Sequence, residues 1–447
     1  MDDGLHSSLT AFEAAKLIKS RKLKSVELVR SCLEKIKKND AQIRAWTNYD
    51  SESALQQSAA LDAISQACGP VGSLHGIPVG IKDIVDTKDF PTERGSPIFA
   101  GRRPDADAAI IDRLREAGAI VLGKTITTEF AFMNPAETRN PHNLTQTPGG
   151  SSSGSAASVA ALHVPLAIGT QTNGSVIRPA SFCGVFGFKP TRGMIPRTGI
   201  LETSRSLDQV GVFARTLKDA ALLADSISGH DSRDPLSLPR PRPEMLKGCL
   251  SEVPVEPVFA FFELPFAERQ SEDAKQGVEE LLDVLEKRVE RLPAPQGFAD
   301  LVEAHRKIHE FEICVHLGNI FSSHWHLVSE PLRRAVERGR SISESEYENA
   351  LLQMHGAKDY FTKFFLDYDA VISPSATGEA PPFEDGTGDP IFCTVWTLCG
   401  LPTISMPLLV GKSNLPVGVQ LVGGMERDDR LLRTARWIID EIRTVDT

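Results

Sequence analysis

Apolar residues recur along the chain with two periods, one typical of helices and the other of buried strands. Near the start, Ser8 or Thr10 can cap a segment in which Phe12 and Ile18 belong to a helical apolar face. Ser25 opens a second segment of this kind, which runs through Ile36. Both segments have polar outer faces and begin at a residue type that caps helices. The pattern therefore predicts two packing helices before the first strand.

From about residue 72 the pattern changes to short, β-branched runs bracketed by glycine. Residues 75–87 (HGIPVGIKDIVDT) and 119–125 (AIVLGKT) are typical of buried strands, and residues 108–118 predict an amphipathic helix between them. Helical patterns then cover residues 274–292 and 301–328, and further strand-like runs lie at 369–375, 402–410 and 415–424. This alternation predicts an α/β fold with a central mixed β-sheet covered on both faces by helices.

Composition limits the classes of protein to which the chain can belong. Of the 447 residues, 41% are hydrophobic, which allows a sizeable core, and no repeat or strong boundary divides them. We therefore expect a single domain over residues 1–447, with a proline-rich surface excursion at about 236–257. The 49 basic residues against 59 acidic ones, a net charge of −10, argue against nucleic acid as a partner.

Three further features predict a cytoplasmic enzyme. No apolar run approaches the roughly 20 residues that span a membrane. The first residues, MDDGLHSSLT, lack the basic and apolar regions of a signal peptide. The seven cysteines are scattered without a C-x-x-C pair, which is typical of reduced thiols. We expect no membrane partner, and base rates for oligomers favour a homodimer.

Lys82 stands inside one of the apolar, strand-like runs. Burial disfavours the charged form of a lysine, so a neutral amine becomes available as a proton acceptor. A serine hydroxyl needs such an acceptor to attack a carbonyl group. An ion pair with Asp83 or Asp86 is the alternative interpretation, and spacing alone gives the two equal weight.

Two clusters rich in glycine and serine, residues 149–154 and 172–175, flank an alanine-rich helical segment. Backbone N–H groups in such a cluster can point inward and form an oxyanion hole. The donors in the second cluster are Thr172, Asn173, Gly174 and Ser175. A tightly turned loop without chemistry is the alternative for each cluster taken alone, but two clusters with one buried lysine favour a catalytic site.

Three other motifs are weaker. Gly150, Ser152 and Gly154 match the G-x-S-x-G nucleophile elbow, but the polar NLTQTP before them is no strand. The first cluster also lacks the lysine of a phosphate-binding loop. His305 and His309 are spaced like zinc ligands, yet Arg306 stands where the zinc-protease motif needs glutamate. No metal site is predicted.

Residues 147–191 (TPGGSSSGSAASVAALHVPLAIGTQTNGSVIRPASFCGVFGFKPT) resemble the signature region of the amidase signature family, and HGIPVGIKDIVDT resembles its lysine strand. The resemblance extends over nearly the whole chain and weakens between about 235 and 389. It implies a catalytic core at about 70–215 and a divergent substrate-pocket region at about 235–390. It also implies a triad of Ser175 as nucleophile, Ser151 as a bridging serine after a cis peptide bond, and Lys82 as base.

The chain departs from this family pattern at three positions. Gln171 stands at the usual Asp, Asn173 at the first Gly, and Arg178 lies three residues after the serine instead of two. We expect Asn173 to accept left-handed backbone angles in the turn, and Gln171 to remove a charge that ties down the loop. These changes indicate a subfamily that keeps its activity.

The predicted function is hydrolysis of the C–N bond of a small carboxamide through an acyl-enzyme, which releases ammonia or an amine and leaves a carboxylic acid. No cofactor is implied, because the lysine takes the place of a metal. One alternative is the glutaminase subunit of a glutamyl-tRNA amidotransferase, which acts with a partner chain. Another is a non-catalytic scaffold, which the intact Lys82, Ser151 and Ser175 argue against.

The substrate pocket is the least determined part of the prediction. Phe130, Met133 and Asn134 precede the first cluster and are candidates for its wall. Three aromatic residues lie in the divergent region or at its border, namely Phe383, Phe392 and Trp396. They would suit an apolar acyl group, although core packing is the favoured interpretation for them.

Overall fold

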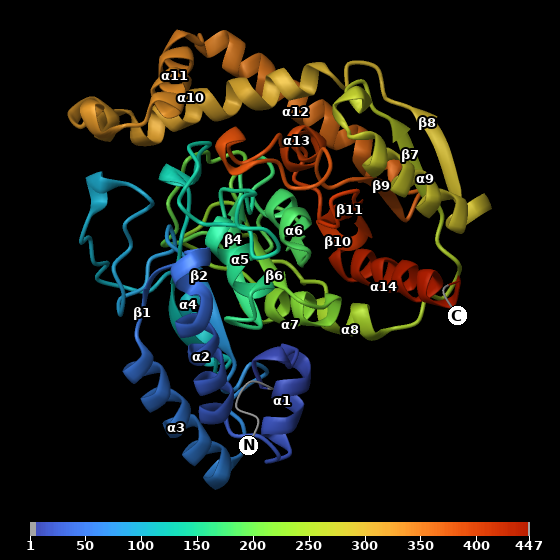
Figure 1. Cartoon of the computed structure of the whole chain (residues 1–447). Coiled ribbons are helices and arrows are strands. Elements are labelled where there is room, and N and C mark those ends of the chain that lie inside the picture. Colours follow the sequence, from blue (N-terminus) through green and yellow to red (C-terminus); the bar gives the residue numbers. More distant parts are fainter. Residues whose placement is uncertain (1–5, 446–447) are drawn as a thin grey trace.

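A computed structural model describes residues 6–445, and one large mixed sheet runs through this part of the chain (Figure 1). In spatial order its strands are β1 (Trp46–Tyr49), β3 (Ile120–Thr125), β2 (Pro78–Lys82), β4 (Leu166–Gln171), β6 (Gln209–Ala214), β5 (Phe186–Lys189), β10 (Thr403–Val410), β11 (Pro416–Val422), β9 (Ala370–Pro374), β7 (Phe259–Glu263) and β8 (Val289–Pro293). Strands β3, β2 and β4 pair in parallel, as do β9, β7 and β8, whereas the pairs between these groups and the β1–β3 pair are antiparallel. The predicted mixed sheet is confirmed.

The α-helices are α1 (Ala11–Lys19), α2 (Ser25–Ile43), α3 (Ser51–Cys68), α4 (Ala109–Glu116), α5 (Ser153–Ala160), α6 (Ile177–Cys183), α7 (Leu217–Ile227), α8 (Met245–Leu250), α9 (Glu272–Leu285), α10 (Asp300–Ser323), α11 (Glu330–Ser341), α12 (Glu344–Phe364), α13 (Ile391–Leu398) and α14 (Asp428–Val445). Short 3₁₀ helices lie at His6–Ser8, Pro97–Phe99, Glu129–Ala131, Ala267–Arg269, Glu286–Arg288, Trp325–Leu327 and Phe383–Asp385. Helices α10, α11 and α12 lie together at one end of the molecule, opposite α1, α2 and α3 (Figure 1).

Helices cover both faces of the sheet, as predicted. In β3, Val121 belongs to one hydrophobic cluster, which includes residues of α4 and α7, while Ile120 and Leu122 belong to a second one with residues of α2 and α5. The two clusters thus take alternate side chains of the same strand. Because both faces are buried, the strand reads as a continuous apolar run instead of an alternating one.

The first N-terminal helix begins at its predicted cap, whereas the N-cap of α2 is Lys24, which forms no side-chain cap hydrogen bond, and Ser25 is the first residue of the helix. Thr10 accepts a hydrogen bond from the backbone of Glu13, whose side chain bonds back to Thr10, so α1 begins with a capping box.

One prediction was wrong: the helical pattern assigned to residues 274–292 ends at Leu285. Val289–Pro293 forms the edge strand β8 instead, because it pairs in parallel with β7.

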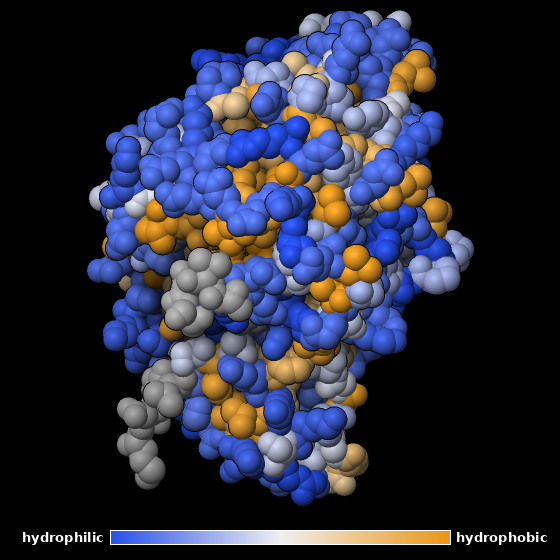
Figure 2. Space-filling model, turned by 90° about the vertical axis from the view of Figure 1, so that its right-hand side faces the viewer, coloured by the Kyte–Doolittle hydropathy of each residue, from blue (hydrophilic) through white to orange (hydrophobic). Residues whose placement is uncertain are grey.

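The surface in Figure 2 is mainly hydrophilic, with apolar side chains scattered over it. Between residues 6 and 445, no helix combines the length and the apolar character that a membrane crossing needs.

Candidate active site

Strand β2 carries Lys82 as its last residue, at the end of the strand that faces the glycine-rich loops. The side chain is fully buried (0% exposed). Its Nζ lies 2.7 Å from Ser151 Oγ and 2.8 Å from Thr170 Oγ1, the latter on the neighbouring strand β4. Within residues 6–445, the hydrogen-bond partners of this amine are therefore two hydroxyl groups and no carboxylate.

The neighbouring aspartates are paired with other cations, so the ion-pair interpretation of Lys82 is wrong. Asp83 Oδ1 lies 3.4 Å from Lys124 Nζ, and Asp86 Oδ1 lies 2.7 Å from Arg102 Nη1. Burial holds the pKa of Lys82 well below its ordinary value, and the negative charge of Asp208 opposes this shift only in part. Neutral Lys82 can accept a proton.

Ser151 follows a cis peptide bond between Gly150 and Ser151, as the resemblance implies. Arg178, buried on α6, donates to the carbonyl oxygen of Gly150 at 2.7 Å and to that of Gly388 at 2.8 Å. Arg178 thus fixes the backbone beside Ser151, although it lies three residues after Ser175 and not two as in the family pattern. The segment before Gly149 contains no strand, so the G-x-S-x-G match is accidental.

Loop 172–175, between β4 and α6, is the predicted oxyanion loop, and Gln171 holds its two ends together. Gln171 Oε1 accepts from the N–H groups of Val176 (2.7 Å) and Ile177 (3.0 Å), at the start of α6. Its Nε2 donates to Thr397 Oγ1 on α13 at 2.9 Å. The expectation that Gln171 loosens the loop is wrong, because a neutral amide supplies both the acceptor and a donor.

Asn173 is held from α13 as well. Thr394 Oγ1 lies 2.8 Å from Asn173 Oδ1, and Thr397 Oγ1 donates to the Asn173 carbonyl at 2.5 Å. The φ angle of Asn173 is not positive, so the expected left-handed conformation is wrong. Its side chain instead accepts the hydrogen bond from Thr394. Within residues 6–445, the N–H groups of Asn173, Gly174 and Ser175 meet no protein acceptor, and they remain available to a ligand.

Gln171→Leu is expected to lower the free energy of unfolding by about 1–3 kcal/mol. The substitution leaves the buried N–H groups of Val176 and Ile177 without an acceptor, at the cost of their desolvation. Urea unfolding measures the change, and Gln276→Leu, on the exposed face of α9, controls for the change of residue type. Equal unfolding midpoints for the two variants would contradict this role of Gln171.

Ser175 lies beside a cavity of about 750 Å³ and is 8% exposed. The described structure has no hydrogen bond between Ser175 and Ser151, and such contacts often form only when substrate is bound. The cavity is lined by Ala131, Phe132, Met133, Thr172, Asn173, Gly174, Ser175, Arg178, Arg269, Val302, His305, Arg306, His309, Glu310, Glu330, Pro331, Arg334, Arg338, Asp389, Pro390, Ile391 and Thr394. Its wall is both apolar and charged, and α10 and α11 supply much of it.

Of the three wall residues proposed before loop 149–154, only Met133 lines the cavity. Phe130 is buried and packs edge-on against Phe321, with ring centroids 5.1 Å apart. Of these aromatic residues, Phe392 and Trp396 follow the core-packing interpretation, whereas Phe383 is only partly buried and belongs to no hydrophobic cluster of the described residues. Trp396 and Phe392 belong to a buried aromatic cluster, and the Phe383 ring lies under the guanidinium of Arg139.

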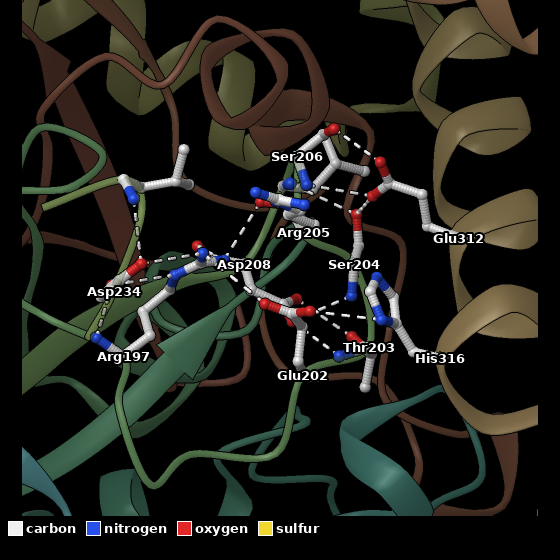
Figure 3. A network of polar contacts seen from close by, with 12 residues as sticks. Arg197, Glu202, Thr203, Ser204, Arg205, Ser206, Asp208, Asp234, Glu312 and His316 are labelled. Carbon is white, nitrogen blue, oxygen red and sulfur yellow. Dashed lines mark hydrogen bonds and ion pairs between the residues drawn. The ribbon is translucent and has the colours of Figure 1, made fainter.

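Asp208 anchors both loop 172–175 and the segment before β6, and Figure 3 shows it among the residues of that segment. It accepts from Thr172 Oγ1 at 2.6 Å, from the Thr203 N–H at 2.7 Å and from the Ser204 N–H at 2.9 Å. Figure 3 shows Glu312 reaching from α10 to the same segment, where it accepts from Ser204 and Ser206. Asp208 therefore has two effects: its negative charge raises the pKa of Lys82, and its hydrogen bond to Thr172 holds loop 172–175 in place.

Asp208→Asn is expected to move the acid limb of the pH–rate profile to lower pH. If Lys82 is the base, it acts only when neutral, so the rate of serine labelling rises with pH through the pKa of Lys82. The Asp208 carboxylate stabilises the ammonium form and raises that pKa, and its removal lowers it further. The pH dependence of covalent serine labelling measures this shift, and Asp234→Asn, which touches Arg197 instead, is the control. A shift to higher pH would contradict the assignment.

His305 and His309 both lie on α10, and burial lowers the pKa of each, to about 3 and about 4. Among residues 6–445, no group of three or more His, Cys, Asp or Glu side chains is arranged to hold a metal ion.

A family model for amidases matches residues 27–432. The chain belongs to the amidase signature family. A relative from Alkaliphilus metalliredigens, one of the subunits of a glutamyl-tRNA(Gln) amidotransferase, is 32% identical over 93% of this chain and 93% of its own length. Membership supports a hydrolase that acts on carbon–nitrogen bonds.

Solved structures agree with this fold. The peptide amidase of Stenotrophomonas maltophilia is 26% identical, with a TM-score of 0.84 over 98% of both chains. A chain of an unexpected vestigial protein complex, described as revealing the evolutionary origins of an s-triazine catabolic enzyme, is 25% identical. Its TM-score is 0.91 over 97% of this chain and 98% of that chain.

Sequence reasoning missed Thr170, Asp208 and the two threonines of α13 as parts of the site. Thr170 stands on β4, two residues before the start of loop 172–175. That spacing is a local signal that could have identified it. Thr394 and Thr397 are more than 200 residues away along the chain, and the sequence contains no signal for their contact with Asn173.

Proposed function

We propose that this amidase hydrolyses a carboxamide with Ser175 as nucleophile, Ser151 as proton relay and Lys82 as base. The observation that carries the proposal is the buried Lys82 Nζ, 2.7 Å from Ser151 Oγ and without a carboxylate partner. A charged, paired lysine would have no lone pair for this task, whereas a desolvated amine has one.

The reaction follows from these positions. Lys82 takes the proton of Ser151, Ser151 takes that of Ser175, and Ser175 Oγ attacks the carbonyl carbon. The N–H groups of loop 172–175, from Thr172 to Ser175, stabilise the oxyanion, an interaction whose loss typically costs about 10²–10³ in rate per donor. The relay then returns a proton to the leaving nitrogen as the C–N bond breaks, and water hydrolyses the acyl-enzyme by the same route.

Intact-mass labelling with a small-alkyl fluorophosphonate tests the proposal without a known substrate. Ser175 Oγ forms the bond to phosphorus, the P–F bond breaks, fluoride leaves and the serine proton passes to Lys82. We expect one adduct per chain. The absence of any adduct at millimolar probe would favour a non-catalytic scaffold.

A second candidate function is that of the ammonia-producing chain of a glutamyl-tRNA amidotransferase. It is supported by the match to the amidotransferase chain from Alkaliphilus metalliredigens, which spans 93% of both proteins. In that function the substrate is glutamine, and partner chains receive the ammonia. The stand-alone function requires neither glutamine nor a partner chain.

Ammonia release separates the two candidates. The purified chain is incubated with glutamine, asparagine, a peptide amide and simple aliphatic and aryl amides, alone and with any proteins that co-purify from its native host. Turnover of simple amides by the isolated chain supports the stand-alone amidase. Glutamine turnover that depends on a co-purifying protein supports the amidotransferase function.

A further inference from the structure

One long-range contact to loop 172–175 comes from the divergent part of the chain. His305, on α10, is 2% exposed, and its Nε2 lies 2.8 Å from the carbonyl oxygen of Thr172. A carbonyl oxygen only accepts hydrogen bonds, so Nε2 carries the proton and donates it. Burial and the neighbouring His309 keep the ring neutral by lowering its pKa, and Nδ1 is therefore unprotonated.

The Thr172 carbonyl and the Asn173 N–H belong to one peptide group. Because that group is planar and trans, the N–H points away from the side to which the C=O points. A donor that fixes the carbonyl therefore also fixes the direction of the N–H. The next peptide group follows the same rule, since Thr397 holds the Asn173 carbonyl at 2.5 Å and so orients the Gly174 N–H.

The side chain of Thr172 is held separately, by Asp208 at 2.6 Å. The residue is thus anchored on one side through its hydroxyl group and on the other through its carbonyl. Without His305, the hydroxyl anchor would remain but the peptide plane between Thr172 and Asn173 would be free to rotate. Rotation of that plane takes the Asn173 N–H out of line with the oxyanion.

We propose that His305 is a positioning residue, which directs the Asn173 N–H toward the oxyanion through its hydrogen bond to the Thr172 carbonyl. The proposal rests on the function proposed above. It gives α10, a helix of the divergent region, a defined part in the chemistry. Glu312 on the same helix holds Ser206 in the segment that ends at Asp208, so α10 supports the oxyanion loop through two routes.

The same helix offers a matched control. His309 lies one turn further along α10, lines the same cavity and has its ring centroid 6.0 Å from that of His305. Its ring packs against Phe132, at 5.2 Å. Between residues 6 and 445, His309 has no hydrogen bond to loop 172–175, so its replacement changes packing and cavity shape without touching the peptide plane.

The test compares His305→Leu, His305→Gln and His309→Leu with the unsubstituted chain, by the kinetics of fluorophosphonate labelling. The phosphoryl oxygen of the probe occupies the oxyanion position as the adduct forms. We expect His305→Leu to lower the maximal labelling rate by about 10–100-fold, with the half-saturating probe concentration within about threefold. His305→Gln, whose Nε2 replaces that of histidine, should recover most of the rate. His309→Leu reshapes the cavity and is expected to change the half-saturating probe concentration, while the maximal labelling rate stays within about threefold.

Different results overturn different statements. If the unsubstituted chain takes up no label, the proposed function fails and this inference falls with it. If it is labelled but His305→Leu reacts at the same rate, or His305→Gln is as slow as His305→Leu, the positioning role fails and the function stands. A rise only in the half-saturating concentration would make His305 a substrate contact instead.

A second measurement applies even if His305→Leu does not fold. The ¹⁵N spectrum of the chain labelled at histidine reports which ring nitrogen carries the proton, and the signal missing from His305→Gln identifies His305. A neutral ring protonated at Nε2 is expected from pH 6 to 9. Protonation at Nδ1 would exclude the hydrogen bond to Thr172 and overturn the proposal.

Discussion

Ser175→Ala is expected to abolish the fluorophosphonate adduct and to lower amide hydrolysis by roughly 10⁴–10⁶-fold, the scale seen when a serine nucleophile is removed. Ser175 belongs to loop 172–175 and lines the cavity. The N–H groups of Asn173, Gly174 and Ser175, which meet no protein acceptor within residues 6–445, lie in the same loop. The methyl group of alanine fills almost the same space, so the fold is expected to persist. Intact mass after exposure to the probe gives the result directly.

Ser153→Ala is the matched control, because this serine lies in the first glycine–serine cluster and its hydroxyl group only bonds weakly, at 3.4 Å, to a backbone carbonyl. It should label as the unsubstituted chain does. An adduct that survives Ser175→Ala would assign the nucleophile to Ser151 or Ser152 and would refute the order of the relay.

Lys82→Met is expected to lower both the labelling rate and the turnover by roughly 10²–10⁴-fold, the usual contribution of a general base. Methionine matches the length of lysine without a proton acceptor. The free energy of unfolding should change little, within about 2 kcal/mol, because the lost contacts to Ser151 and Thr170 are offset by the removal of a desolvated amine.

Lys124 provides the contrast, since it is buried on the adjacent strand β3 but pairs with Asp83. Lys124→Met leaves that carboxylate buried without its cation, which typically costs about 3–5 kcal/mol. Chemical unfolding and labelling kinetics should therefore separate the two lysines, one affecting rate and the other stability. Near-normal turnover in Lys82→Met would eliminate the lysine-base mechanism.

The two lysines also show where sequence reasoning stopped. Each ends or nearly ends an apolar run, and the local pattern around both is similar. The partners of the two lysines differ because Lys124 pairs in register with Ile81, one position before Lys82, so the two lysine side chains point to opposite faces of the sheet. The pattern alone left an ion pair and a free amine with equal weight.

Position 171 is a second example. From the sequence, Gln171 in place of the usual Asp was expected to remove a charge that holds loop 172–175 in place. In the structure the amide does more, since its oxygen caps α6 and its nitrogen reaches α13. The second contact joins residues 226 positions apart in the chain, and no local rule predicts it.

The sequence by itself determined the class of fold, the strands that carry Lys82 and the loops that carry Ser151 and Ser175, because hydrophobic periodicity and glycine-rich turns are local properties. It also indicated the family through the order of those motifs. Only the tertiary structure decided which groups surround Lys82 and what holds loop 172–175. Those partners, Asp208, His305 and Thr397, come from distant segments. A hydrogen bond between distant segments depends on packing geometry, which is fixed only when the chain has folded.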